Sequence, residues 1–145
     1  MSNMREINNG VGEYIKNAFS NYDNQVSIKF SFDNASAKRV SGSDYLLVFG
    51  IRWGSVDRIG IGCDLHQYFA NAYINIYGAL KTGKVLAMED IAAHVMQQFR
   101  NFAEEDESVN KHHVSFNNFV ITNVQEVDNK YLITVSAILR FNSQL

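Results

Sequence analysis

Cys63, Asp64 and His66 lie close together in the middle of the chain and are the residues best suited to chemistry. A cysteine near a histidine suits a nucleophile with its base, or half of a zinc site. Because the chain has no second cysteine, a zinc site would need distant histidines. We therefore expect a partly buried cysteine and a surface histidine, with no catalytic residue and no bound metal.

The remaining histidines give no stronger signal for a metal site. His112 and His113 are adjacent in a polar stretch. Neighbouring side chains of an extended loop point apart, so this pair would chelate a metal poorly. His94 falls beside the apolar stripe of a predicted helix, where a packed histidine or one at the rim of the core is the ordinary case.

Two glycine-containing stretches resemble nucleotide-binding loops only in part. Gly60-Ile61-Gly62 lacks the third glycine and the following helix of a dinucleotide fingerprint. Residues 78–84 end in Gly-Lys before a helix, but Val85 stands where a phosphate loop carries Ser or Thr for magnesium. We expect turns or loops in both places, and no cofactor.

An amphipathic helix that follows residues 78–84 is the clearest element of the chain. Its apolar residues recur at steps of three and four and therefore share one face. Acidic residues oppose the dipole at its end, so we expect it to stop near Phe102 or Ala103. A shorter helix is predicted from about Asn9 to Tyr22. The apolar stripe of the longer helix consists of Met88, Ile91, Ala92, Val95, Phe99 and Phe102.

Alternating or continuous apolar runs predict strands around this helix. Gly54-Ser55 is typical of a turn or a bulge, and Asp128-Asn129 of the turn in a closing hairpin. The order predicts one α+β domain over residues 1–145, whose mostly antiparallel sheet of about four to six strands packs against the main helix. The predicted strands are Val26–Phe32, Tyr45–Trp53, Tyr68–Tyr77, Phe119–Val127 and Tyr131–Phe141.

The composition is that of an ordinary globular domain and argues against several classes of protein. A net charge of −2 disfavours nucleic acid held by bulk electrostatics. Lys38-Arg39, and Arg52 with Arg58, are too sparse for a basic patch. A single cysteine forbids an intrachain disulfide, which favours a reducing compartment. No apolar run approaches the length of a membrane span, so we expect no membrane partner.

Two further groups of residues are candidate interaction surfaces. Four aromatic residues of the second and third predicted strands would suit a protein contact on an outward face, or would form a second covered face of the sheet. Four consecutive acids after the main helix would bind a cation or a basic partner, or simply form a solvated helix end. The aromatic set is Trp53, Tyr68, Tyr73 and Tyr77, and the acidic run is Glu104, Glu105, Asp106 and Glu107.

The order of elements and the middle of the chain resemble the tail-terminator proteins of long-tailed bacteriophages. The resemblance begins with a short N-terminal helix (Val11 to Ser20), a first strand, and a second strand followed by a turn that contains Gly54 and Arg58. It continues through a strand ending in Tyr-Ile-Asn-Ile-Tyr-Gly, a helix that includes Asp90 to Phe99, and a closing hairpin.

This resemblance implies a structural virion protein of the tail–neck region, assembled in the host cytoplasm, and not an enzyme. Members form a closed ring, commonly a hexamer, through contacts between unlike faces of neighbouring subunits. Such a ring caps the tail tube protein, receives the head–tail connector or neck protein, and passes DNA through its lumen without specific binding. Neck proteins share the fold, so a neck position is an alternative. The interface candidates are the aromatic set with Arg52 and Arg58, and the lumen or ring-face candidates are the acidic run.

Two other classes remain open. A small hydrolase using Cys63 or His66 would lose its reaction, but not its fold, on Cys63→Ala substitution. A small ligand-binding or inhibitor protein would line a pocket with the aromatic set, and its melting temperature would rise when ligand is added.

Overall fold

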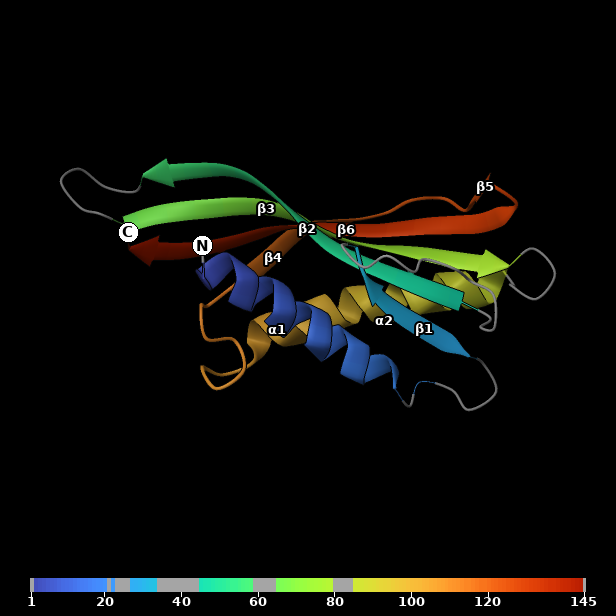
Figure 1. Cartoon of the computed structure of the whole chain (residues 1–145), viewed down its shortest axis with the longest axis horizontal. Helices are drawn as coiled ribbons and strands as arrows, with labels where there is room; N and C mark the ends of the chain where they lie inside the picture. The colour runs from blue at the N-terminus through green and yellow to red at the C-terminus, as the bar shows by residue number, and fades with distance from the viewer. Residues whose placement is uncertain are drawn as a thin grey trace.

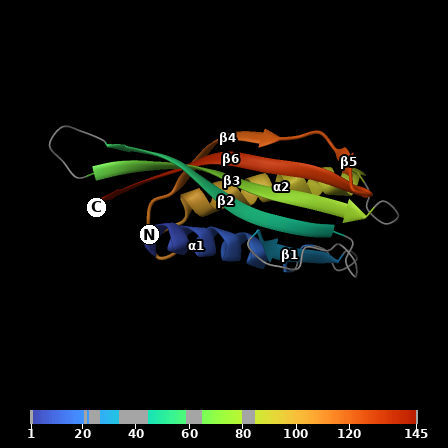
Figure 2. The same cartoon turned by 45° about the horizontal axis from the view of Figure 1, so that its top comes forward.

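The computed structural model describes residues 2–20, 22, 27–33, 45–58, 65–79 and 85–144. The chain forms two layers, a mixed sheet and a pair of helices (Figures 1 and 2). This confirms the predicted α+β class with a mostly antiparallel sheet. The elements are α1 (Ser2–Phe19), β1 (Ile28–Phe32), β2 (Tyr45–Arg58), β3 (Leu65–Ala79), α2 (Val85–Glu104), β4 (Ser115–Ile121), β5 (Gln125–Val127) and β6 (Lys130–Gln144).

The described strands form one sheet in the order β1-β2-β3-β6-β4, and β5 also pairs with β6. β1 and β2 run parallel, whereas the other described pairs are antiparallel. Both helices lie against the same face of this sheet (Figures 1 and 2). We call the opposite face the open sheet face, because no described helix lies on it, although Leu46 and Val48 of β2 are buried there, with 1 % and 2 % of their surfaces exposed. It is defined by Arg52 on β2, by Phe69, Tyr73 and Tyr77 on β3, and by Lys130 and Arg140 on β6.

α1 confirms the predicted N-terminal helix but begins at Ser2, well before Asn9. The reason is that Ile7, one turn before Val11, extends the apolar stripe that packs on the sheet. Ile7 gives the otherwise polar first turns a contact with the core, so the helix extends toward the N-terminus. The buried stripe recurs every four residues and consists of Ile7, Val11, Ile15 and Phe19.

α2 packs its predicted stripe completely into the core, because every stripe residue is buried. The helix ends at Glu104, slightly beyond the predicted end. Gly78 on β3 allows the start of α2 to approach the sheet, since a Cβ atom there would lie 2.7 Å from the Sδ atom of Met88. The sheet supplies the facing half of the core through Ala72, Ile74 and Ile76 on β3 and Ile133, Val135 and Leu139 on β6.

The turn expected around Gly54 and Arg58 is wrong, because both residues lie inside β2. The alternative of a bulge is confirmed: the pairing of β2 with β3 shifts register between Trp53 and Val56. A bulge inserts an extra residue and increases the local twist without ending the strand. β2 therefore continues to Arg58 alongside the first residues of β3.

The closing hairpin is confirmed at Asp128 and Asn129, whose φ angles are 52° and 63°. Two positive φ angles are those of a type I′ turn, which matches the twist of the strands it joins. The single strand expected over Phe119–Val127 is instead divided into β4 and β5. β4 also begins at Ser115, before the predicted start, and it contains a register shift between Asn117 and Val120 with a positive φ angle at Asn118, which bends the strand.

Three strands are much longer than the helices that cover them. β2, β3 and β6 contain 14, 15 and 15 residues, and each spans about 45–50 Å at roughly 3.3 Å per residue. α1 and α2 contain 18 and 20 residues, or about 27–30 Å at roughly 1.5 Å per residue. Figure 1 shows the ends of β2, β3 and β6 projecting past the start of α1. The sheet therefore reaches beyond its helix layer at this end.

Candidate functional site

The open sheet face combines cationic and aromatic side chains from neighbouring strands. A cation over a ring face is attracted by the ring's quadrupole, which contributes about 0.5–1 kcal/mol at an exposed site. The pairs are Arg52 with Tyr73, Lys130 with Tyr77 and Arg140 with Phe69, at distances of 5.6, 5.5 and 5.7 Å from charged group to ring centre. The aromatic rings of this face are thus partly covered by charged groups, of which Arg52 is exposed, whereas the Nε atom of Arg140 is buried.

Tyr73 is a buried residue of the open sheet face, with 8 % of its surface exposed. Its ring lies over Gly50, where a Cβ atom would be 2.6 Å from the Cζ atom of Tyr73. The Tyr73 hydroxyl donates a hydrogen bond to the carboxylate of Asp33. Burial raises the pKa of the Tyr73 phenol, Asp33 raises it further, and the guanidinium of Arg52 opposes both. The phenol is therefore a fixed hydrogen-bond donor and no candidate for a nucleophile.

The aromatic set does not share one face of the sheet, so that part of the prediction is wrong. Tyr73 and Tyr77 lie on the open sheet face, whereas Trp53 and Tyr68 point to the helix side. Trp53 and Tyr68 pack on Phe141, with ring centres 5.6 and 4.7 Å away. Side chains alternate along a strand, and Tyr68 differs in parity from the other two tyrosines.

Arg52 and Arg58, the two basic interface candidates, are both placed on β2. Arg52 is exposed on the open sheet face beside Tyr73. The backbone of Arg58 pairs with that of His66 on β3. The role of these residues in an interface stays a prediction. Lys38 and Arg39 lie outside the described residues.

The acidic run lies at the end of α2 and in the loop that follows, with all four side chains exposed. Glu105 accepts a hydrogen bond of 3.0 Å from the hydroxyl of Tyr14 on α1. The pKa of the Tyr14 phenol is raised by burial and by this carboxylate. The pKa of Asp106 is lowered by hydrogen bonds from the hydroxyl and the backbone amide of Ser108. Much of the run is therefore engaged in holding the loop.

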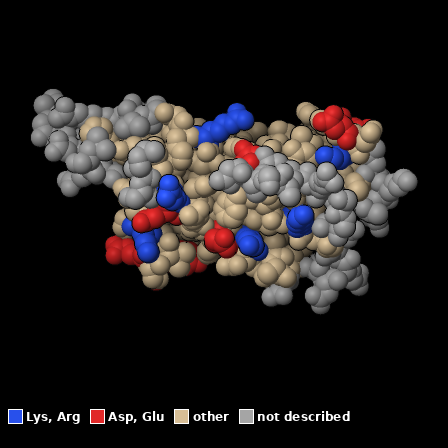
Figure 3. Space-filling view, in the orientation of Figure 1, with Lys and Arg blue, Asp and Glu red and all other residues tan. Residues whose placement is uncertain are grey.

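Charged side chains form no continuous patch on the face of the molecule drawn in Figure 3, as far as its described residues show. Lys and Arg appear there as separate groups, with Asp and Glu between several of them.

Three of the described histidines, His94, His112 and His113, are packed against rings or lie beside carboxylates. His94 lies between the rings of Phe19 and Tyr22, at 4.9 and 5.0 Å, and burial lowers its pKa. His112 and His113 point apart, as expected: His112 lies 2.9 Å from Glu6 and His113 lies 3.3 Å from Glu107. Among the described residues, no group of three His, Cys, Asp or Glu side chains could hold a metal ion.

Several predicted motifs fall outside the described residues. These are Gly60-Ile61-Gly62, Cys63 and Asp64, together with residues 80–84 of the glycine-lysine stretch. His66 lies on β3, and its backbone pairs with that of Ser143 as well as that of Arg58. Neither α1 nor α2 combines the length and the hydropathy that crossing a membrane requires.

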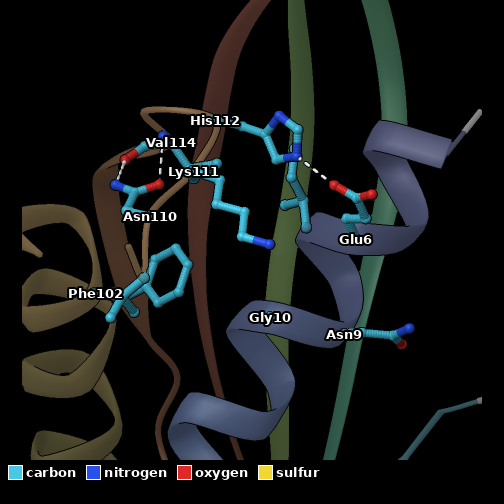
Figure 4. Close-up of a pocket in the computed structure, with 10 residues that line it drawn as sticks. Glu6, Asn9, Gly10, Phe102, Asn110, Lys111, His112 and Val114 are labelled. Atoms are coloured by element: carbon cyan, nitrogen blue, oxygen red, sulfur yellow. Dashed lines mark hydrogen bonds and ion pairs between the residues drawn. The ribbon is translucent and has the colours of Figure 1, made fainter. Parts of the chain in front are cut away.

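A pocket of about 250 Å³ lies between α1 and the loop of residues 105–114 (Figure 4). The loop is held by Asn110, which is 3 % exposed. The Asn110 side-chain amide donates to the backbone carbonyl of Val114 at 3.0 Å, and its oxygen accepts from the Val114 amide at 2.8 Å. The pocket was not predicted from the sequence. The one sequence feature that could have indicated the pocket is Gly10, a glycine inside a helix. An added Cβ atom there would meet nothing within 4 Å.

Comparisons with known proteins give no family for this chain: no protein-family model matches it, and no curated protein matches it. The described part of the chain offers at least two features suited to binding. One is the open sheet face, with its shielded aromatic rings. The other is the pocket beside α1, with an apolar floor and a charged rim.

Proposed function

We propose that the protein is a structural subunit that assembles into a closed ring, and that this ring is the tail terminator of a long-tailed bacteriophage. The proposal keeps the element order of the tail-terminator resemblance, apart from the turn at Gly54. It gives the chain no enzymatic role. A neck protein of the same fold, between the head connector and the tail, is the alternative position.

The observation that carries the proposal is the incomplete cover of the sheet. The helices cover one face, and no described helix lies on the opposite face, where Arg52 is exposed although Leu46 and Val48 are buried; the ends of β2, β3 and β6 also project past the start of α1 (Figure 1). A sheet normally buries its faces against another layer. Neighbouring subunits of a ring would supply that layer.

The two edges of the sheet also support contacts between unlike surfaces. One edge is β2 beyond Phe49, where no described strand pairs with it, and the other is β4. Both edges carry a bulge, which discourages continuous strand pairing between molecules. Neighbours would therefore meet through side chains, and two different edges favour the head-to-tail contacts that close a ring.

In this ring the acidic run, Glu104 to Glu107, would face the lumen or one ring face. Carboxylates there would repel passing DNA, so that it moves through without binding. The tail tube protein and the head–tail connector or neck protein would dock on opposite ring faces. Charge reversal of the run that left assembly and DNA passage unchanged would count against this role.

Light scattering combined with negative-stain imaging tests the ring. We expect a particle of about six subunits with a central hole, the number implied by the resemblance. Arg52→Glu, on the open sheet face, should dissociate it. Arg100→Glu is the matched control, because it makes the same charge change and also removes a cation from a ring, that of Phe119, but on the helix side.

A compact dimer without a hole would contradict the ring, as would equal effects of the two arginine variants. Circular dichroism of both variants checks that neither has unfolded. The specific role is tested by adding the protein to growing tail tubes of a long-tailed phage. A terminator should cap the tubes at one end, whereas a neck protein should bind only after the cap is present.

A further inference from the structure

The pocket beside α1 has an apolar floor that belongs to the core of the protein. Ile7, Phe102 and Val114 line it, and each exposes 3 % or less of its surface. Gly10 adds no side chain to the wall, and a Cβ atom at this position would meet nothing within 4 Å. The floor therefore offers contact to an apolar group that enters from the side of α1.

The rim of the pocket carries one positive charge that no described residue neutralises. Glu6 and His112 both line the rim, but they pair with each other at 2.9 Å. Lys111 extends from the loop toward α1, with its nitrogen directed over the gap between the loop and Gly10 (Figure 4). No described residue forms an ion pair with Lys111. His112 compensates the charge of the Glu6 carboxylate only when its ring is protonated, so a bound anion would lie on the Lys111 side of the rim.

We propose that this pocket binds a small organic carboxylate with an apolar body of about the size of one aromatic ring, such as phenylacetate. The body would lie on Phe102 and Ile7, and the carboxylate would accept charge-assisted hydrogen bonds from the Lys111 ammonium. An apolar cavity of about 150 Å³ holds one benzene molecule. The pocket, at about 250 Å³, therefore has room for a ring and its carboxylate.

Other ligand classes fit the same walls less well. An inorganic phosphate could accept from Lys111, but it has no apolar body to fill the floor formed by Ile7, Phe102 and Val114. A neutral aromatic molecule would fill the floor but leave Lys111 unused. A cation would be repelled by Lys111. The apolar floor and the ammonium of Lys111 together select an amphiphilic anion.

The test is a two-dimensional NMR titration of the whole chain with three probes: phenylacetate, its neutral analogue phenylacetamide, and acetate. Phenylacetate should shift amide signals of residues 6–10 and 109–114. Phenylacetamide and acetate should bind at least about tenfold more weakly, the factor expected for one hydrogen bond to a charged group or for loss of the apolar body. Equal affinity for the acid and its amide would overturn the proposal.

Three variants locate the site. Lys111→Met should abolish the preference for phenylacetate over phenylacetamide, and Gly10→Leu should remove binding of both by filling the pocket. Lys16→Met, which removes an exposed lysine of α1 outside the pocket, is the control and should bind like the original chain. Leucine favours a helix more than glycine does, so Gly10→Leu should stay folded. Binding that survives in Gly10→Leu, or no shifts with phenylacetate at its solubility limit, would refute the site.

This inference does not depend on the ring. The pocket lies on the helix side, away from the open sheet face. A chain that forms rings but does not bind phenylacetate would refute only the pocket, and the reverse result would refute only the ring.

Discussion

Two glycines of α1 are predicted to respond in opposite ways to alanine. Gly10 and Gly12 both lie inside the helix, where glycine costs roughly 1 kcal/mol relative to alanine. A Cβ atom at Gly10 would meet nothing within 4 Å. Gly10→Ala should therefore gain the whole helix preference and raise the free energy of unfolding by about 0.5–1 kcal/mol.

Gly12 instead lies where α1 crosses the aromatic residues of β1 and β2. A Cβ atom there would lie 2.8 Å from the Cζ atom of Phe32, closer still to its Cε1 atom, and 3.1 Å from Cδ2 of Phe49. The Phe32 ring is held edge-on by Phe30 and Phe49, at 5.7 and 6.0 Å, so turning it away would forfeit those contacts. Overpacking costs about 1–3 kcal/mol, which outweighs the gain in helix preference.

Comparing the two variants isolates the effect of packing, because the change in intrinsic helix propensity from glycine to alanine is the same in both. The expected difference between them is about 1–3 kcal/mol in the free energy of unfolding, measured by urea titration with equal m-values. Gly10→Ala should also raise the melting temperature by roughly 1–4 °C for a chain of this size. If Gly12→Ala stabilised the protein as much as Gly10→Ala does, the close contact of α1 with Phe32 would be refuted.

Three more substitutions test the loop and the helix pair. Asn110→Ala should lower the free energy of unfolding by about 2–3 kcal/mol, because it leaves both the amide and the carbonyl of Val114 buried without their partner; urea titration measures this, and a change below about 0.5 kcal/mol would contradict the buried bridge. The pKa of His94 is lowered in the folded state, so the unfolded chain binds the proton more readily and stability should fall as the pH drops below about 6.5. His94→Phe should flatten this part of the profile, and an unchanged slope in thermal melts would exclude His94 as the cause. The pKa of Asp106 is also lowered, so its contribution is present above a pH of about 4 and lost as the pH falls further; Asp106→Asn should remove that loss, which the same melts detect.

Helices and strands whose buried residues recur at the period of the helix or strand itself were predictable from the sequence. The stripe of α2 needs no knowledge of its partners, because steps of three and four place its apolar residues on one face whatever packs there. The same holds for β6, whose alternate residues Ile133, Val135 and Leu139 are all buried. The turn at Asp128 and Asn129 was predictable because it depends on two residues that accept positive φ angles.

Features that depend on register or on distant contacts were not predictable in this way. Trp53 faces the helix side because it pairs with Ala70, and that pairing is fixed by the whole length of β2 and β3. The strand parity of Tyr68 would have separated it from Tyr73, so part of this error was avoidable. The pocket depends on the loop conformation that Asn110 fixes through Val114, a contact that no periodic pattern marks.

The open sheet face has properties that would suit the proposed ring subunit before it assembles. Its aromatic rings are covered by cations from neighbouring strands, so the largest apolar groups on this face are shielded from water. Cation–ring contacts at a surface are worth little individually, and a long charged side chain can swing away at small cost. A neighbouring subunit could therefore displace these cations and reach the rings, or pair with the charges where they stand. Either route would convert this face into a contact without refolding of the sheet, as the proposed ring requires.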